Sequence, residues 1–399
     1  MRILWVAPFI LHPTTSGSQI RTLGIVRNLH RRHEVHFAAL LSAKQHEGVG
    51  QANDYCAHLH TTPHEVPHRT SLAFLPQLVG SIKDPLPLSV RRYVSDPLKQ
   101  LVAKIVQEQR FDVILADFLF SASNVPALED AVLFQHNVES IIWQRLAERA
   151  PTALRRMYFR GQARKMEVYE REVCRRAKRV IAVSSVDAQY FRDKFGITDA
   201  VSVSTGVDTE YFARPASPEP YTDLVFTGGM DWMPNVEGIV WFVKEILPAI
   251  HARRPATRLS IVGRSPVAEI KKLAERDSRI TVTGTVPDIR PYLWGSRVSL
   301  VPLRVGSGTR LKIYEAMAAG VPVVSTSIGA EGLVYHDGKD ICIGDSPVKM
   351  ADACCGLLDD DHRWNAQSKA ARVLVEEHFS WAAVTTEFER LLLPAASQA

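Results

Sequence analysis

The sequence predicts an α/β protein with two Rossmann-like, doubly wound parallel-sheet domains. Three observations predict this class. The chain has 399 residues, more than one hydrophobic core usually organises. Short apolar runs alternate with helical patterns in both halves, which is typical of parallel strands buried on both faces. A stretch with three prolines and few large apolar residues, 206–223, separates the halves and has the composition of a linker.

The first half, residues 1–205, is predicted to form one such domain. Its first strand runs from Ile3 to Phe9, and a small-residue loop, His12 to Ser18, follows it. A helix over 19–31 comes next. Further strands are expected over 34–41, 113–116, 131–134, 179–183 and 201–203. Helical segments between these runs predict βαβ connections.

The second half, residues 206–380, repeats the pattern. Strands are expected over 224–227, 258–262, 280–283, 298–302 and 321–325, with helices over 235–250, 267–275, 289–294 and 311–319. The last segment, 381–399, is not needed by this sheet and is expected to pack back on the first domain. Two facing α/β domains would place a ligand cleft between the carboxyl ends of their strands.

Composition excludes several classes of protein. A hydrophobic content of 46% and a charged content of 23% indicate an ordinary globular chain, and the net charge of +5 does not by itself call for nucleic acid. The five cysteines show no zinc-ligand spacing and suit a reducing compartment. No apolar window is long enough to span a membrane, and His12 and Pro13 interrupt the apolar start. We therefore expect a cytoplasmic protein.

Basic residues are concentrated between Arg145 and Arg179, where twelve of them face four glutamates. One interpretation is a solvated helix face with Glu–Arg pairs. The other is a surface for an anionic acceptor or for peripheral contact with the inner membrane surface.

The most informative stretch is VGSGTRLKIYEAMAAG, residues 305–320. Small residues, among them Ser307 and Gly308, precede a helix expected to begin near Thr309, and a helix amino end with free N–H groups suits an anion. Arg310 and Lys312 add two cations beside that end. Glu315 lies one turn deeper on the same face and can accept ribose hydroxyls. A nucleoside diphosphate is the occupant this pattern predicts; the alternative is a capped helix with a Lys–Glu pair.

Two common signatures are missing. The stretch lacks the Gly-Lys-Ser/Thr of a Walker A loop, and no G-x-G-x-x-G follows the first strand. These absences disfavour a P-loop NTPase and an NAD-dependent dehydrogenase.

The chain resembles the GT-B retaining glycosyltransferases of family GT4 over nearly its whole length. The resemblance rests on SGSQIRT at 16–22, QHNVES at 135–140, VTGTVPD at 282–288 and, above all, GSGTRLKIYEAMAAGVPVVSTSIGAEGL at 306–333. The family carries two glutamates eight residues apart, of which Glu315 matches the second, the one that binds the donor ribose. Ser307 stands at the first position, so the resemblance leaves the donor sugar undefined.

The resemblance also implies site residues. Arg310 and Lys312 match the basic residues that neutralise the leaving diphosphate, and His136 matches a histidine near the donor sugar. The expected donor-binding residues are Gly17, Ser18, Val286, Asp288, Ser307, Gly308, Thr309, Leu311 and Glu315. FTGGMDWMPN, at 226–235, lacks the basic residue that family members usually carry there, and Arg310 is inferred to replace it.

Several of these residues have ordinary structural interpretations. Gly17 can be a turn glycine, and His136 can belong to a strand-end turn. Arg21, on the first turn of the predicted helix over 19–31, can equally well form a surface salt bridge.

The function expected from this resemblance is transfer of a sugar, with retained configuration, from a UDP- or GDP-linked donor to a carbohydrate, lipid-linked or small-molecule acceptor. No cofactor and no metal are expected, because no Asp-x-Asp pair lies at a strand end. Two alternatives stay open: a nucleotide-sugar epimerase, which would need further acid/base carboxylates, and an inactive nucleotide-sugar binding protein.

Overall fold

A computed structural model describes residues 1–14, 17–67, 74–148, 150, 152–219, 221–305 and 310–392. The chain forms two compact units. The first contains residues 1–204 and 385–399, and the second contains 205–384. The boundary predicted from the sequence, after residue 205, lies one residue later than this division.

The first unit is built on a seven-stranded parallel sheet in the order β3-β2-β1-β4-β5-β6-β7. The strands are β1 (Arg2–Ala7), β2 (Glu34–Leu41), β3 (His58–Pro63), β4 (Val113–Asp117), β5 (Ala131–Gln135), β6 (Arg179–Ala182) and β7 (Val201–Ser202). This is a doubly wound order, whose direction reverses beside β1. The carboxyl ends of β1, β4 and β5 therefore lie next to one another.

The helices of the first unit are α1 (Gly17–His30), α2 (Phe74–Gly80), α3 (Leu88–Arg91), α4 (Asp96–Glu108), α5 (Glu139–Glu148), α6 (Ala153–Arg176) and α7 (Ser185–Tyr190). Leu4 and Val6 of β1 pack into the cluster that includes α4 and α6 residues. Trp5, on the other face of β1, contacts Phe388 with ring centroids 5.9 Å apart. Phe388 belongs to α15 (Trp381–Leu392), so the last helix contributes to this core.

The second unit has a six-stranded parallel sheet in the order β10-β9-β8-β11-β12-β13. The strands are β8 (Thr222–Thr227), β9 (Leu259–Val262), β10 (Ile280–Gly284), β11 (Ser296–Val301), β12 (Val323–Ser325) and β13 (Cys342–Ile343). The helices are α8 (Met233–Trp241), α9 (Leu247–Arg253), α10 (Ala268–Arg276), α11 (Arg290–Trp294), α12 (Leu311–Ala318), α13 (Pro347–Asp359) and α14 (Asp361–Leu374).

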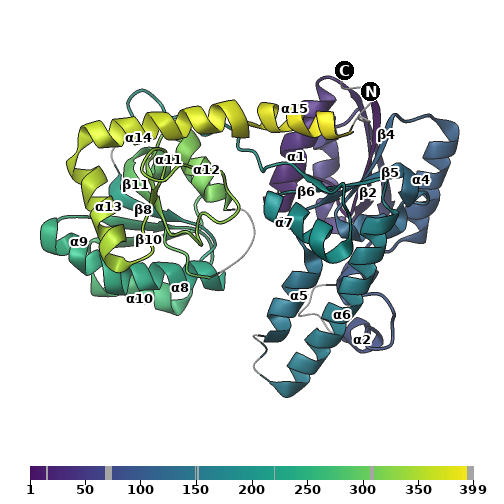
Figure 1. The fold of residues 1–399 in the computed structure, drawn as a ribbon, viewed down its shortest axis with the longest axis horizontal. Coiled ribbons are helices and arrows are strands. Elements are labelled where there is room, and N and C mark those ends of the chain that lie inside the picture. The colour runs from purple at the N-terminus through teal and green to yellow at the C-terminus, as the bar shows by residue number, and fades with distance from the viewer. Residues whose placement is uncertain are drawn as a thin grey trace. The chain divides into compact units, whose positions relative to one another are not determined.

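Alternate residues of β8 face two separate cores. Phe226 packs into the cluster that includes α8, α10 and α13 residues, whereas Val225 packs into the cluster with α12 and α14 residues. Figure 1 shows α8 and α10 on one side of this sheet and α12 and α14 on the other. This packing explains the continuous apolar runs of the strands, because both faces are covered.

The structure differs from the sequence prediction at a few elements. Helix α1 begins at Gly17, so Gly17 and Ser18 belong to its first turn and not to the preceding loop. Two edge strands, β3 and the two-residue β13, were not predicted; the sequence of β3, HLHTTP, is polar and lacks an apolar run. Strand β8 begins at Thr222, two residues before the predicted strand. Among the described helices, none is both long enough and apolar enough to cross a membrane.

Candidate functional site

The predicted anion site begins outside the described residues, because Ser307, Gly308 and Thr309 are not described. Helix α12 begins at Leu311, and Arg310 immediately precedes it. The Arg310 side chain is buried, with 5% of its surface exposed. Leu311, predicted to bind the donor, is thus the first residue of the helix.

Lys312 lies on the first turn of α12 and points to the carboxyl end of β8. Its Nζ donates a hydrogen bond to Asn235 Oδ1 at 3.0 Å and lies 4.5 Å from the centre of the Phe226 ring. Lys312 as a whole is partly exposed, and its Nζ lies among these neighbours. Burial lowers the Lys312 pKa from 10.5 to about 7; Glu315 opposes this change and Arg310 adds to it.

Gly228 makes room for this lysine, and Gly263 makes room for Gly228. A Cβ on Gly228, which follows β8 with φ +151°, would lie 2.8 Å from Lys312 Nζ and 2.6 Å from Asn235 Nδ2. A Cβ on Gly263 would lie 1.7 Å from the Gly228 carbonyl oxygen. Asn235 Nδ2 also donates to the Gly229 carbonyl at 2.9 Å. Asn235 therefore joins the loop after β8 to Lys312.

Glu315 lies one turn after Lys312 and is the acidic member of this group. Burial raises the Glu315 pKa from 4.5 to about 7, against the opposing effect of the Lys312 charge. The Lys312 and Glu315 pKa values are thus both shifted toward the neutral form. A ligand that supplies negative charge to Lys312 and hydroxyl donors to Glu315 would favour both charged forms.

Val286 and Asp288 lie in the loop between β10 and α11. Val286 is partly buried against the core that contains α12 residues. The Asp288 carboxylate forms an ion pair with Arg290 at 2.7 Å and accepts the Arg290 backbone N–H at 2.9 Å. Arg290 also lies over the Tyr211 ring at 3.9 Å. The Asp288 side chain is therefore engaged within its own unit, and base recognition by the backbone of this loop stays a prediction.

In the first unit, Gly17 and Ser18 open helix α1 after the carboxyl end of β1. Gly17 is exposed and Ser18 is partly buried. The position within the first turn keeps these residues suitable for an anion, since the first N–H groups of a helix have no partner inside the helix. Their contact with a donor stays a prediction.

His136, predicted to lie near the donor sugar, is the centre of a buried network. Its Nδ1 accepts a hydrogen bond from Arg21 Nη1 at 3.2 Å, so Nε2 carries the proton and donates to Asp117 Oδ1 at 2.7 Å. Thr22 Oγ1 donates to the other Asp117 oxygen at 2.8 Å. The His136 side chain is 1% exposed, and burial lowers its pKa. The imidazole is therefore neutral, and both its nitrogens are in use.

An aromatic contact fixes the ring in place. Phe118, which follows β4, stacks on His136 with ring centroids 3.8 Å apart and an interplanar angle of 3°. Phe118 has φ +67°, which is unusual for a residue with a side chain, and its N–H donates to the Phe134 carbonyl at 3.0 Å. In this arrangement His136 orients Arg21 and Asp117. Direct contact between His136 and a sugar stays a prediction.

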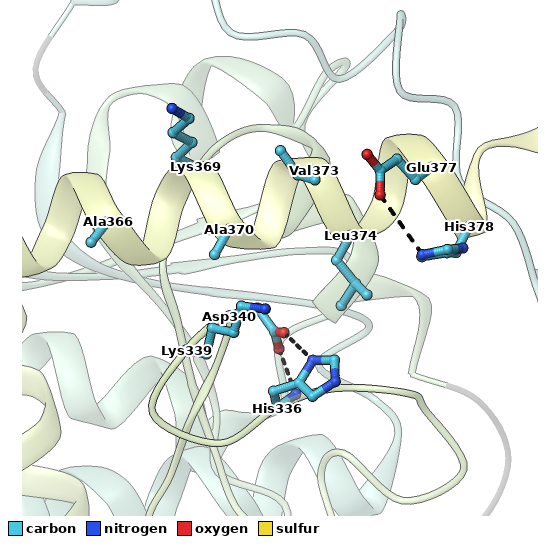
Figure 2. A pocket seen from close by; sticks show the side chains of 10 residues that line it. All are labelled: His336, Lys339, Asp340, Ala366, Lys369, Ala370, Val373, Leu374, Glu377 and His378. Atoms are coloured by element: carbon cyan, nitrogen blue, oxygen red, sulfur yellow. Dashed lines mark hydrogen bonds and ion pairs between the residues drawn. The ribbon is translucent and has the colours of Figure 1, made fainter.

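Sequence reasoning missed Asn235, Asp117 and Thr22. Asp117 directly follows the predicted strand over 113–116, so a search for polar residues at strand ends would have found it. Asn235 lies eight residues after the predicted strand over 224–227 and opens a predicted helix. Thr22 carries no such signal. The surface hollow in Figure 2, lined by the 336–340 loop and by residues of α14 and the turn after it, contains none of the predicted site residues.

Comparison with known proteins agrees with these features. Residues 15–211 match the family described as Glycosyltransferase Family 4, and residues 221–360 match the family described as Glycosyl transferases group 1. The chain therefore belongs to the GT4-type glycosyltransferases. The expected family and enzyme class are confirmed at this level.

Curated relatives include a phosphatidyl-myo-inositol mannosyltransferase of Mycobacterium tuberculosis. It is 26% identical over 227 residues, which are 53% of this chain and 58% of that protein. The chain thus spans little more than half the length of this relative.

Solved structures have the same fold. The sucrose-phosphate synthase of Thermosynechococcus elongatus aligns over 98% of both chains with 18% identity and a TM-score of 0.68. HepE of Anabaena, solved with UDP, aligns over 98% of this chain and 99% of that one with 15% identity and a TM-score of 0.66. The two parallel-sheet units, together with these neighbours, confirm the expected GT-B fold class.

Proposed function

We propose that the chain is a glycosyltransferase that moves a sugar from a UDP- or GDP-linked donor to an acceptor hydroxyl, with retention of configuration. The observation that carries the proposal is the Lys312–Asn235–Glu315 group beside the Gly228 loop. A buried ammonium group is costly unless an anion accompanies it. Here Lys312 has a neutral amide as its hydrogen-bond partner. A diphosphate would add negative charge that the amide does not supply.

The donor would be held by the second unit. The diphosphate would meet Lys312, Arg310 and the N–H groups at the start of α12, and the ribose hydroxyls would reach Glu315. This interpretation is supported by the position of Lys312 and Glu315 one turn apart on α12. HepE, whose structure contains UDP, shares the fold.

During transfer, the bond between the anomeric carbon and the diphosphate oxygen breaks, and a bond from the acceptor oxygen to the same carbon forms on the same face. The acceptor hydroxyl proton passes to the leaving phosphate oxygen. Negative charge develops on the departing diphosphate, so Lys312 and Arg310 would lower the barrier electrostatically. No metal and no cofactor take part in this scheme, and unchanged turnover in EDTA is the expected result.

Three outcomes of one assay distinguish the candidate functions. UDP- and GDP-sugars are incubated with and without carbohydrate or lipid-linked acceptors, and both nucleotide release and donor configuration are measured. A transferase releases nucleotide faster when an acceptor is present. An epimerase changes the donor sugar without an acceptor, and an inactive binding protein leaves the donor intact.

The acceptor is proposed to be presented at an anionic membrane surface through α5 and α6, which pack against each other (Figure 1). Part of the basic segment has structural roles: Lys165 Nζ donates to the Ser81 carbonyl at 2.8 Å, and Arg171 pairs with Glu167. Other members are exposed beside exposed apolar side chains, namely Arg155, Arg160 and Arg164 beside Leu154 and Met157. A basic face with apolar side chains suits a membrane surface.

Co-sedimentation with liposomes tests this contact. Arg155→Gln combined with Arg160→Gln and Arg164→Gln should reduce binding to anionic vesicles at low salt, and added salt should reduce wild-type binding. The matched control replaces Lys271 and Lys272 of α10, which are also exposed. Equal binding by both variants would mean that the basic segment is only a solvated helix face.

A further inference from the structure

A cluster of imidazoles and one carboxylate lies at the amino-terminal edge of the first unit's sheet. Glu34 and His36 belong to β2, and His58 belongs to the edge strand β3, directly across from His36. One ligand atom from each of these three residues lies within 4.8 Å of the other two, the one such group among the described residues. His60, two residues further along β3, completes the cluster.

The distances within the cluster suit a small metal ion. His36 Nε2 lies 3.1 Å from Glu34 Oε1, and His58 Nε2 lies 3.8 Å from the same oxygen. Zinc bonds to nitrogen and oxygen of 2.0–2.1 Å in a tetrahedron place neighbouring ligand atoms about 3.3 Å apart. The His58 side chain is 54% exposed, so it has room to rotate by the small amount required.

The residues around these three atoms orient them. His36 Nδ1 lies 3.2 Å from His60 Nε2, so it can donate its proton there while Nε2 binds a metal. Arg2 Nε donates to Glu34 Oε2 at 3.0 Å and leaves Oε1 toward the histidines. Phe111 contacts the His36 ring edge to face, with centroids 5.0 Å apart. Such outer partners are typical of histidine metal sites.

We propose that Glu34, His36 and His58 bind a divalent transition-metal ion, zinc by preference, with a fourth position left to water. Two imidazoles and one carboxylate form a donor set that zinc accepts, whereas magnesium and calcium prefer oxygen ligands alone. The ion joins the amino ends of β2 and β3. Asp117 and His136 lie at the carboxyl ends of β4 and β5, so the ion stabilises the first unit and takes no part at those residues.

Sequence patterns do not reveal this site because its ligands come from two strands. HEVH at 33–36 and HLH at 58–60 are separated by more than twenty residues, and β3 was not predicted as a strand. The absence of a Cys/His zinc motif from the sequence therefore does not argue against this site. Only the pairing of His36 with His58 brings the ligands together.

Titration of the untagged, EDTA-treated full chain with Zn²⁺ tests the proposal. The wild type should bind one ion tightly, and thermal unfolding should shift to higher temperature with Zn²⁺. His58→Ala should weaken binding at least tenfold and abolish the shift. His378→Ala is the matched control, because His378 is also exposed, at 62%, and also lies 3.8 Å from a glutamate. It should bind Zn²⁺ as the wild type does.

A second measurement, of Co²⁺ absorption, tests the site even if a variant folds too poorly for thermal unfolding to be compared. Co²⁺ bound by the wild type should give visible absorption bands of a tetrahedral or five-coordinate ion, and Glu34→Gln should change or remove these bands. The proposal is overturned if the wild type binds no Zn²⁺, or if His58→Ala and His378→Ala bind it equally well.

Discussion

The buried charged groups of the two units differ in how completely they are satisfied. In the first unit, Arg21, His136 and Asp117 form a chain of hydrogen bonds in which both imidazole nitrogens are occupied. In the second unit, burial moves the Lys312 and Glu315 pKa values toward each other, both to about 7. The partner of Lys312 is the uncharged amide of Asn235.

This difference separates two uses of buried polar groups. A closed network such as that of His136 fixes the ends of neighbouring strands and loses stability when any member is removed. A buried cation whose hydrogen-bond partner is uncharged is costly in the free protein and gains most when an anion binds. The comparison therefore assigns a positioning role to the His136 network and a binding role to Lys312.

The largest expected effect is on stability. His136→Ala leaves Asp117 without its 2.7 Å partner in a buried setting and should destabilise the first unit by about 3 kcal/mol. At about 2 to 4 °C per kcal/mol for a unit of this size, the unfolding temperature should fall by about 6 to 12 °C. Differential scanning calorimetry measures it.

A matched control exists in the second unit. His336 lies 2.7 Å from Asp340 (Figure 2), as His136 does from Asp117. Asp340 is buried like Asp117, but the His336 side chain is 58% exposed. Asp340 keeps the bond from the His336 backbone N–H at 2.8 Å after the substitution, so His336→Ala should cost less than His136→Ala, about 1 to 2 kcal/mol. Equal losses in the two variants would remove the distinction between a closed buried network and a pair with one exposed member.

The next effect is on turnover. Lys312→Ala should slow sugar transfer at least tenfold, and as much as the roughly 10²- to 10³-fold typical for loss of one transition-state donor. The transfer rate is measured as nucleotide release from the UDP- or GDP-sugar that the wild type uses. Lys271→Ala, on the exposed face of α10, serves as the control and should leave the rate unchanged. A Lys312→Ala enzyme with wild-type turnover would exclude Lys312 from the reaction.

Glu315→Ala should chiefly weaken donor binding. Loss of hydrogen bonds to a charged group costs about 1.5 to 3 kcal/mol, so the dissociation constant of the nucleoside diphosphate should rise about ten- to hundredfold. Inorganic pyrophosphate, which lacks ribose, should bind the variant and the wild type equally. Glu275→Ala, exposed on α10, should affect neither ligand. Equal weakening of both ligands would contradict ribose recognition by Glu315.

A further effect is the pH dependence of stability without ligand. Between pH 7 and 10.5 the unfolded chain keeps a proton on Lys312 that the folded chain has released, so stability contributed by this group rises with pH. Between pH 4.5 and 7 the folded chain retains a Glu315 proton, so that contribution falls with pH. Lys312→Met should therefore unfold at a higher temperature than the wild type. This difference should be largest near pH 7 and smaller near pH 9.5. A constant gap would mean that the Lys312 pKa is not lowered.

Sequence patterns were sufficient for the sheets because buried parallel strands are continuous apolar runs, as β1 and β11 illustrate. They failed at β3 and β13, whose short or polar sequences gain stability only from a neighbouring strand. Within the site, the spacing of Lys312 and Glu315 predicted their common helix face. Asn235 and Asp117 were missed because their partners lie 77 and 19 residues away along the chain.

The central claim is that Lys312 meets the diphosphate of the donor. Isothermal titration at pH 8 in buffers of different ionisation enthalpy tests it directly. Free Lys312 is mostly neutral at this pH because its pKa is about 7, and a bound diphosphate should raise that pKa. Binding of UDP or GDP should therefore take up about one proton in the wild type and almost none in Lys312→Met. The same proton uptake in both proteins would contradict the claim.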